Sequence, residues 1–281
     1  MRQPGSDSLK ALIRGAGDLA TGVALCLHHA GFRIIMTELP APTAIRRMVA
    51  FAEAVYQGSQ TVEGVTAERV TAERAAEVLG RGRIAVVADP LAEIRPRFGP
   101  DVAVDAILKK RNLGTTRDFA SIVIGLGPGF VAGSDVDAVI ETMRGHDLGR
   151  IIFAGSAAPD TGMPGDIDGR TAERILRAPV AGVVTLSKRI GDCVRPGDTV
   201  MKVRDVPVAA RIGGCLRGLI HDGILAAEGM KIGDVDPQGD SRYCATVSDK
   251  ARALGRAVLE AVLILGKERG LFQIAGVGNM T

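Results

Sequence analysis

The first forty residues place apolar runs and a glycine turn in an order typical of a β-α-β unit. A short apolar run ends at Arg14, a glycine turn follows, and apolar residues then recur at helical spacing up to Gly31. A second apolar run, Phe32–Met36, leads into Thr37 and Glu38. The pattern predicts a strand, a helix and a second strand.

The turn has the pattern Gly-x-Gly-x-x-Ala, formed by Gly15, Gly17 and Ala20, and Glu38 follows Gly17 by 21 residues. In dinucleotide-binding folds, such glycines permit a tight turn and the approach of a phosphate, and an acid at this distance binds ribose hydroxyls. Asp18 does not fit a phosphate-binding turn, because a carboxylate competes with a phosphate for the amides at a helix N-terminus. The motif predicts nucleotide binding, with a turn that binds nothing as the alternative.

Further apolar runs and turns continue to about residue 153. Alternating β-branched residues predict a hairpin over Gln60–Val70, and Ser121–Phe130 reads as a buried strand that enters a second glycine loop. A helix is expected to begin near Ser134 and to run through Met143. Alternating strands and helices indicate a mostly parallel sheet with both faces covered.

Ligands of such sheets bind outside the carboxyl ends of the strands. A basic cluster after one strand would suit a phosphate, although a solvated basic turn is an equal alternative. His146, beside Asp147, is a candidate for proton transfer or is merely solvated. No catalytic residue and no metal ligand is assigned. The candidate cofactor-binding residues are Gly15, Gly17, Asp18, Ala20, Glu38, Lys109, Lys110, Arg111, Asn112, Gly127 and Gly129.

The second half of the chain contains an internal repeat. A shift of 32 residues places Gly182 on Gly214, Gly191 on Gly223 and Gly197 on Gly229, with apolar positions matched between them. Each half is too short to bury a core alone, so the halves should interlock as a small antiparallel barrel or sandwich. The pattern resembles the barrel-sandwich hybrid of biotinyl and lipoyl carrier domains. The junction Val203–Val208 has no lysine to carry a cofactor, which favours a structural or docking module.

The predicted fold class is therefore α/β, in three parts. Residues 1–175 form a Rossmann-like, mostly parallel sheet, and residues 176–240 form a β-rich, barrel-sandwich-hybrid-like repeat domain. Residues 241–281 contain one long amphipathic helix, with Ser248 as its N-cap, which is expected to pack on the rest and to hold the two domains together.

The composition limits the classes of partner that this chain is expected to bind. The 35 basic and 32 acidic side chains leave a net charge of +3, and the seven Phe and two Tyr offer few platforms for stacking bases, so nucleic acid is not expected. The chain shows no apolar run long enough for a membrane span and no signal peptide, so the cytoplasm is the expected location. The four cysteines form no Cys-x-x-Cys pair, which favours buried free thiols over a metal site.

Several longer strings resemble the selenium-dependent molybdenum hydroxylase system protein family, also called the YqeB family. The N-terminal unit is also similar to the Rossmann part of molybdenum-cofactor insertion chaperones. The strings are Gly15-Ala-Gly-Asp-Leu-Ala-Thr-Gly22, Glu53-Ala-Val-Tyr-Gln-Gly58, Val104-Asp-Ala-Ile-Leu-Lys-Lys-Arg-Asn112, Gly125-Leu-Gly-Pro-Gly-Phe130, Glu141-Thr-Met-Arg-Gly-His-Asp-Leu-Gly149, Leu216-Arg-Gly-Leu-Ile220 and Lys231-Ile-Gly-Asp-Val-Asp-Pro237.

The resemblance implies an accessory or maturation protein for a selenium-dependent molybdenum hydroxylase. Such a protein would bind molybdopterin, its dinucleotide form or another nucleotide-containing cofactor at the glycine turn, and the client hydroxylase would be its protein partner. One alternative is a free-standing NAD(P)-dependent oxidoreductase, and another is a non-catalytic adaptor that docks a hydroxylase. Whether a reaction is catalysed, and whether the chain forms a homo-oligomer, are left open.

Overall fold

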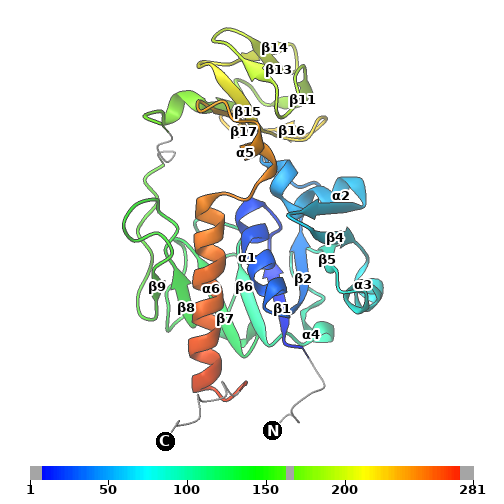
Figure 1. Cartoon of the computed structure of the whole chain (residues 1–281), viewed down its shortest axis with the longest axis vertical. Helices are drawn as coiled ribbons and strands as arrows, with labels where there is room; N and C mark the ends of the chain where they lie inside the picture. Colours follow the sequence, from blue (N-terminus) through cyan, green and yellow to red (C-terminus); the bar gives the residue numbers. More distant parts are fainter. Residues whose placement is uncertain (1–7, 163–167, 273–281) are drawn as a thin grey trace, which may run out of the picture.

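The computed structural model describes residues 8–162 and 168–272 in two stacked parts. Figure 1 shows a large sheet with its helices in one part and a small β-rich part at one end of the long axis. We call these the sheet domain and the β domain.

The sheet domain is built on nine strands in the order β3-β4-β5-β2-β1-β6-β7-β8-β9. The seven strands from β4 to β8 are parallel, and β3 and β9 pair antiparallel at the two edges. The strands are β1 (Lys10–Arg14), β2 (Arg33–Glu38), β3 (Ser59–Val62), β4 (Val65–Arg69), β5 (Ile84–Ala88), β6 (Val102–Asp105), β7 (Ile122–Leu126), β8 (Ala138–Ile140) and β9 (Ile151–Ile152).

Two long helices cover one face of this sheet. α1 (Asp18–His29) follows the glycine turn, and α6 (Asp249–Glu268) comes from the far end of the chain and lies beside it (Figure 1). Their apolar stripes, with Val23 and Val258 among them, pack with strand residues such as Ile13 into one buried core. Ser248 caps α6 as predicted, because its hydroxyl accepts a hydrogen bond from the Ala251 amide.

The other face is covered by shorter elements. α3 (Ala75–Gly80) and α4 (Arg95–Phe98) pack Val78 and Phe98 against Leu12 and Ile35 of the central strands. α2 (Ala54–Gln57), which follows two single 3-10 turns, Arg47–Val49 and Phe51–Glu53, packs instead into the core on the side of α1 and α6. Gly58 ends α2 and adopts a φ of 80°, a conformation that favours glycine.

The β domain consists of two four-stranded antiparallel sheets, β10-β17-β15-β12 and β14-β13-β11-β16. The 32-residue shift maps β10 to β13 onto β14 to β17 in order, so each repeat gives strands to both sheets and the predicted duplication is confirmed. The strands are β10 (Ile175–Arg177), β11 (Gly182–Leu186), β12 (Cys193–Val194), β13 (Thr199–Val203), β14 (Val206–Ala209), β15 (Gly214–Leu219), β16 (Leu225–Ala226) and β17 (Lys231–Asp236).

The predicted combination of a Rossmann-like domain and a barrel-sandwich hybrid is wrong. The large sheet is mixed, with antiparallel pairs at both edges, and the β domain forms two four-stranded sheets. The helix predicted to end at Met143 is instead strand β8, because the run from Val136 to Ile140 buries every residue and leaves no polar face. α6 packs on α1 and the sheet.

The two domains meet through the segment Ile45–Arg47, which leads into α2. The Leu219 amide donates to the Ile45 carbonyl at 2.8 Å, and Arg47 Nε donates to the Leu219 carbonyl at 2.8 Å. Arg46 reaches across to α5 (Arg242–Ala245) and donates to the Tyr243 and Thr246 carbonyls at 2.9 and 3.1 Å. Gly218 is required there, since a Cβ would lie 2.9 Å from the Ile45 oxygen.

The contact between α1 and α6 gives the first prediction. A Cβ on Gly255 would lie 2.4 Å from the Gly22 carbonyl oxygen, so Gly255→Ala must separate the two helices. We expect a loss of about 2 kcal/mol in the free energy of unfolding, measured by urea denaturation. Gly80→Ala is the matched control, because nothing lies within 4 Å of its added Cβ and alanine favours a helix. Equal stability of the two variants would contradict the packing described here.

Candidate functional site

Two adjoining cavities lie at the carboxyl edge of the parallel strands. One, of about 290 Å³, surrounds the glycine turn, and the other, of about 600 Å³, lies between the sheet edge and the β domain. Asp18, Leu19 and Leu108 line both cavities. We call the larger one the cationic cleft, because seven basic side chains line it: Arg46, Lys110, Arg144, Arg174, Arg217, Lys231 and Lys250.

In the smaller cavity, Glu38 holds the glycine turn in place. Its carboxylate accepts hydrogen bonds from the Ala16 and Leu39 amides, each at 2.8 Å. Burial raises the pKa of Glu38 despite these two bonds. Gly15 has a φ of 93°, a conformation that favours glycine, whereas a Cβ on Gly17 would meet nothing within 4 Å. The first turn of α1 also has no side-chain cap, so the space above it is open.

The cationic cleft is lined by four acidic residues, and each of them has a partner. Lys110 bonds Asp160 at 2.5 Å, and Asp18 lies 3.6 Å from Arg46. Asp234 binds Arg174. The Glu141 carboxylate accepts the Met143 and Ala158 amides, each at 2.7 Å, and so fixes the loop after β8.

Two cleft arginines are held from behind by carboxylates outside the cleft lining. Arg144 bonds Asp249 at 2.6 Å, which lowers the pKa of that carboxyl to about 2. Arg217 lies 3.2 Å from Asp236. These pairs keep both guanidinium groups in place at the cleft.

The cleft retains positive charge that its own acids do not compensate. Burial lowers the pKa of Arg46, Lys231 and Lys250, and a nearby arginine lowers it further in each case. The buried Nε–H groups of Arg46 and Arg217 have no hydrogen-bond partner among the described residues. Lys250 forms no ion pair within the described part of the chain. A bound anion would stabilise the cleft cations.

The structure brings some of the predicted site residues together and separates others. Gly15, Gly17, Asp18, Ala20, Glu38 and Lys109 line the smaller cavity, and Lys110 faces the cleft.

The remaining predicted residues shape loops. Asn112 bonds the Thr115 backbone through both its side-chain oxygen and its side-chain nitrogen. A Cβ on Gly129 would lie 2.6 Å from the Arg111 backbone, and one on Gly127 would lie 2.6 Å from the Thr142 hydroxyl. Arg111 and His146 are exposed. Cofactor binding by these residues stays a prediction.

Sequence reasoning missed most of the cationic cleft. Arg46, Arg174 and Lys250 belong to no motif, and only the fold brings them to one cavity. Arg144, Arg217 and Lys231 do lie in strings that carried the family resemblance, which was the one available signal.

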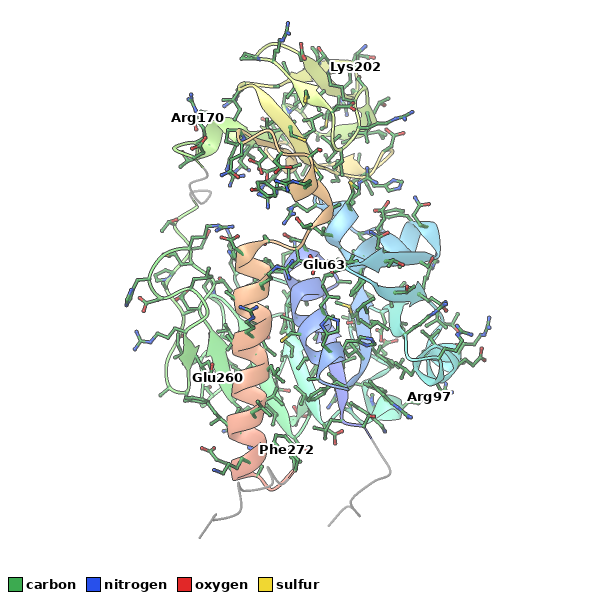
Figure 2. All side chains as sticks on the ribbon, viewed as in Figure 1. Glu63, Arg97, Arg170, Lys202, Glu260 and Phe272 are labelled. Carbon is green, nitrogen blue, oxygen red and sulfur yellow. The ribbon has the colours of Figure 1, made fainter. Side chains whose placement is uncertain are left out.

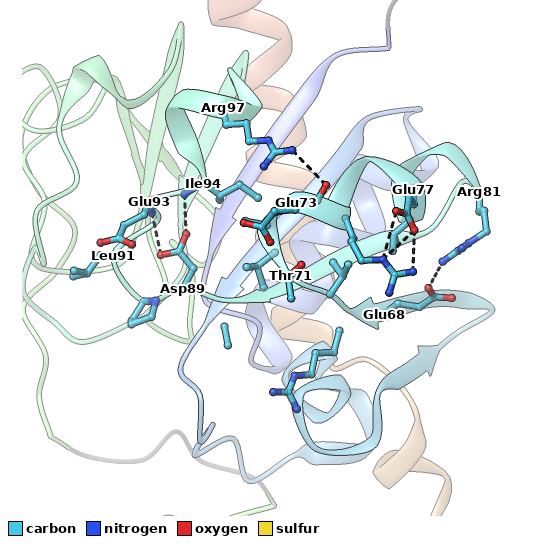
Figure 3. Close-up of a pocket in the computed structure, with 18 residues that line it drawn as sticks. Glu68, Thr71, Glu73, Glu77, Arg81, Asp89, Leu91, Glu93, Ile94 and Arg97 are labelled. Carbon is cyan, nitrogen blue, oxygen red and sulfur yellow. Dashed lines mark hydrogen bonds and ion pairs between the residues drawn. The ribbon is translucent and has the colours of Figure 1, made fainter.

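A third cavity, of about 1020 Å³, is larger but less suited to a ligand. Figure 3 shows it as an open groove between α3 and the loop before α4. Its charges satisfy one another: Arg81 pairs with Glu68, and Arg74 pairs with Glu77. The Asp89 carboxylate accepts the Glu93 and Ile94 amides and so holds the loop before α4.

Residues 8–162 and 168–272 contain no cluster of three histidine, cysteine or acidic side chains placed to bind a metal ion. In the same ranges, every helix is too short or too polar to cross a bilayer.

A curated sequence from Escherichia coli is similar to most of this chain. No family model matches the chain. This chain is 49% identical over 255 residues to the protein named "Uncharacterized protein YqeB" of Escherichia coli strain K12, and the match covers 90% of this chain. The chain spans about half of that relative, 47% of its length.

Three solved structures show a weaker likeness. They are an aspartoacylase family protein from Mesorhizobium loti (10% identity, TM-score 0.27), the ectoine utilization protein EutE (DoeB) from Ruegeria pomeroyi (14%, 0.27) and a succinylglutamate desuccinylase from Silicibacter sp. TM1040 (14%, 0.25). Each match covers 81–82% of this chain and 85% of the other.

These comparisons contradict the function predicted from the sequence. The relative carries the name of the predicted family, YqeB, but that name mentions neither molybdenum nor selenium. The structural neighbours are aspartoacylase-like and desuccinylase proteins. The prediction of an accessory protein for a selenium-dependent molybdenum hydroxylase is therefore wrong, and its oxidoreductase and adaptor alternatives gain no support. TM-scores this low do not transfer the chemistry of these neighbours to this chain either.

The lowered pKa values give the second prediction. Lys231 and Lys250 should lose their protons at a lower pH than an ordinary lysine, whose pKa is about 10.4. Between pH 7 and 11, acylation by acetic anhydride should therefore reach its half-maximal rate at a lower pH for these two amines. Lys202, exposed at the far end of the β domain in Figure 2, is the internal reference for mass spectrometry. Identical profiles for the three lysines would contradict the described environment.

Proposed function

We propose that this chain binds a small molecule with at least two negative charges, carried by phosphate or carboxylate groups, in the cationic cleft. The observation that carries the proposal is the convergence of seven basic side chains on one cavity that four acidic side chains line. Clefts of 300–1,000 Å³ are typical of small-molecule sites, and this one has about 600 Å³.

Arginine dominates the lining, which favours a ligand with planar or tetrahedral oxyanions. Arg46 and Arg217 present fixed guanidinium groups, and such groups bind two oxygens of one carboxylate or phosphate. Lys231 and Lys250 add point charges on flexible stems. A single monovalent anion would satisfy only part of this set, so the expected ligand is multiply charged.

The cavity at the glycine turn supplies room for an uncharged part of the same molecule. Asp18 lies on the boundary between the two cavities and repels anionic groups from the turn. The anionic end of the ligand should therefore stay in the cationic cleft, while a neutral end reaches Gly17 and Leu108. The cofactors and partners predicted from the sequence stay predictions, and this proposal does not depend on them.

Titration calorimetry with inorganic pyrophosphate and with citrate tests the proposal. Lys250→Gln should weaken binding of the better probe roughly 10-fold or more, since a hydrogen bond to a charged group contributes about 1.5–3 kcal/mol. Asp18→Asn should tighten binding, because it removes a negative charge from the cleft. The two changes alter charge in opposite directions at the same cavity, so a general loss of folding cannot produce both results.

Arg97→Gln is the matched control, because Arg97 lies in the separate groove of Figure 3. Its affinity for the probe should equal that of the unchanged protein. The proposal fails if neither probe binds at millimolar concentration, or if all three variants shift the affinity equally.

A further inference from the structure

Three of the four cysteines gather at one place in the β domain. Cys193 on β12 pairs in register with Cys215 on β15, and Cys244 on α5 lies against Cys215. The Sγ atoms of Cys215 and Cys244 are 3.6 Å apart. Cys215 and Cys244 are buried, whereas Cys193 is exposed.

We propose that this cluster is a thiol–disulfide exchange site, in which a low-molecular-weight disulfide oxidises Cys215 and Cys244 to an intramolecular disulfide through the exposed thiol of Cys193. The proposal is independent of ligand binding in the cationic cleft.

The geometry requires little movement. A disulfide has an S–S bond of about 2.05 Å, so the Cys215 and Cys244 sulfurs must approach by about 1.5 Å. Cys244 belongs to a helix of four residues, and its thiol donates to the Leu216 carbonyl at 3.6 Å besides its contact with Cys215. Directly opposed residues of antiparallel strands have Cβ atoms about 4.5–5.5 Å apart, which places Cys193 within reach of Cys215.

The exchange takes three steps, and each step breaks one bond to sulfur as it forms another. The Cys193 thiolate attacks the small disulfide, forms a mixed disulfide and releases one small thiol. Cys215 then attacks the Cys193 sulfur, which releases the second small thiol. Cys244 finally attacks the Cys215 sulfur, which restores the Cys193 thiol. In total, Cys215 and Cys244 each lose one hydrogen, and one small disulfide is reduced to two thiols.

The second step limits the rate. Burial and the neighbouring Cys244 thiol raise the pKa of Cys215 to about 12, so little thiolate is present at neutral pH. The exchange should therefore accelerate as the pH rises.

The experiment treats the full chain with oxidised glutathione at pH 8 without oxygen, and then counts thiols after quenching and denaturation. We expect the titre to fall from four to two. Peptide mass spectrometry should identify a Cys215–Cys244 disulfide and a free Cys193. Cys26→Ser, which changes the cysteine on α1, is the matched control and should still lose two thiols.

Two variants separate the steps. Cys193→Ser should slow formation of the Cys215–Cys244 disulfide. Cys244→Ser should stop the reaction at an intermediate in which Cys193 is linked to Cys215 or to glutathione. The proposal is overturned if the folded protein, verified by circular dichroism, retains free Cys215 and Cys244 while Cys193 carries glutathione. Equal rates for Cys193→Ser and the unchanged protein would also overturn it.

Discussion

The hydrogen bonds of Arg46 are the interaction on which the cleft depends. Its guanidinium group reaches from the sheet domain to the Tyr243 and Thr246 carbonyls and also lies 3.6 Å from Asp18 at the start of α1. One side chain therefore joins the carboxyl edge of the sheet to α5, beside the β domain. Two main-chain carbonyls fix its far end, and burial lowers its pKa. The same side chain that joins the domains therefore adds a buried positive charge to the cleft.

The buried cations that would favour binding of an anion also lower the stability of the fold when no anion is bound. Buried cations beside other cations raise the free energy of the folded chain unless they are paired. Burial and a neighbouring arginine lower the pKa of Lys231 and Lys250 for the same reason. The carboxylates of Asp236 and Asp249 offset part of this cost from behind the cleft, and Asp18 and Asp234 offset part from within. The seven basic side chains that line the cleft outnumber the four acidic ones. A bound polyanion would offset this excess of positive charge.

The sequence predicts the parts of this molecule that depend on local or repeated patterns. The unit from Lys10 to Glu38 follows from two apolar runs and a glycine turn, and the 32-residue repeat follows from matched glycines. The place of α6 could not be predicted, because its apolar stripe fits any apolar face and only the assembled sheet selects one. β8 was mistaken for a helix because a short, fully buried apolar run has no distinguishing period. The cleft could not be predicted because its basic residues come from positions as distant in sequence as Arg46 and Lys250. The glycine turn matched a known motif, but the sequence could not show that Glu38 occupies the Ala16 amide of that turn.

The most direct measurement is the side-chain Nε–H spectrum of the arginines, recorded by nuclear magnetic resonance during a titration with pyrophosphate. The account predicts that the signals of Arg46 and Arg217 shift together and saturate at the same concentration, while that of Arg97 stays in place. Shifts confined to exposed arginines, or no saturable shift at all, would show that the cationic cleft does not bind anions.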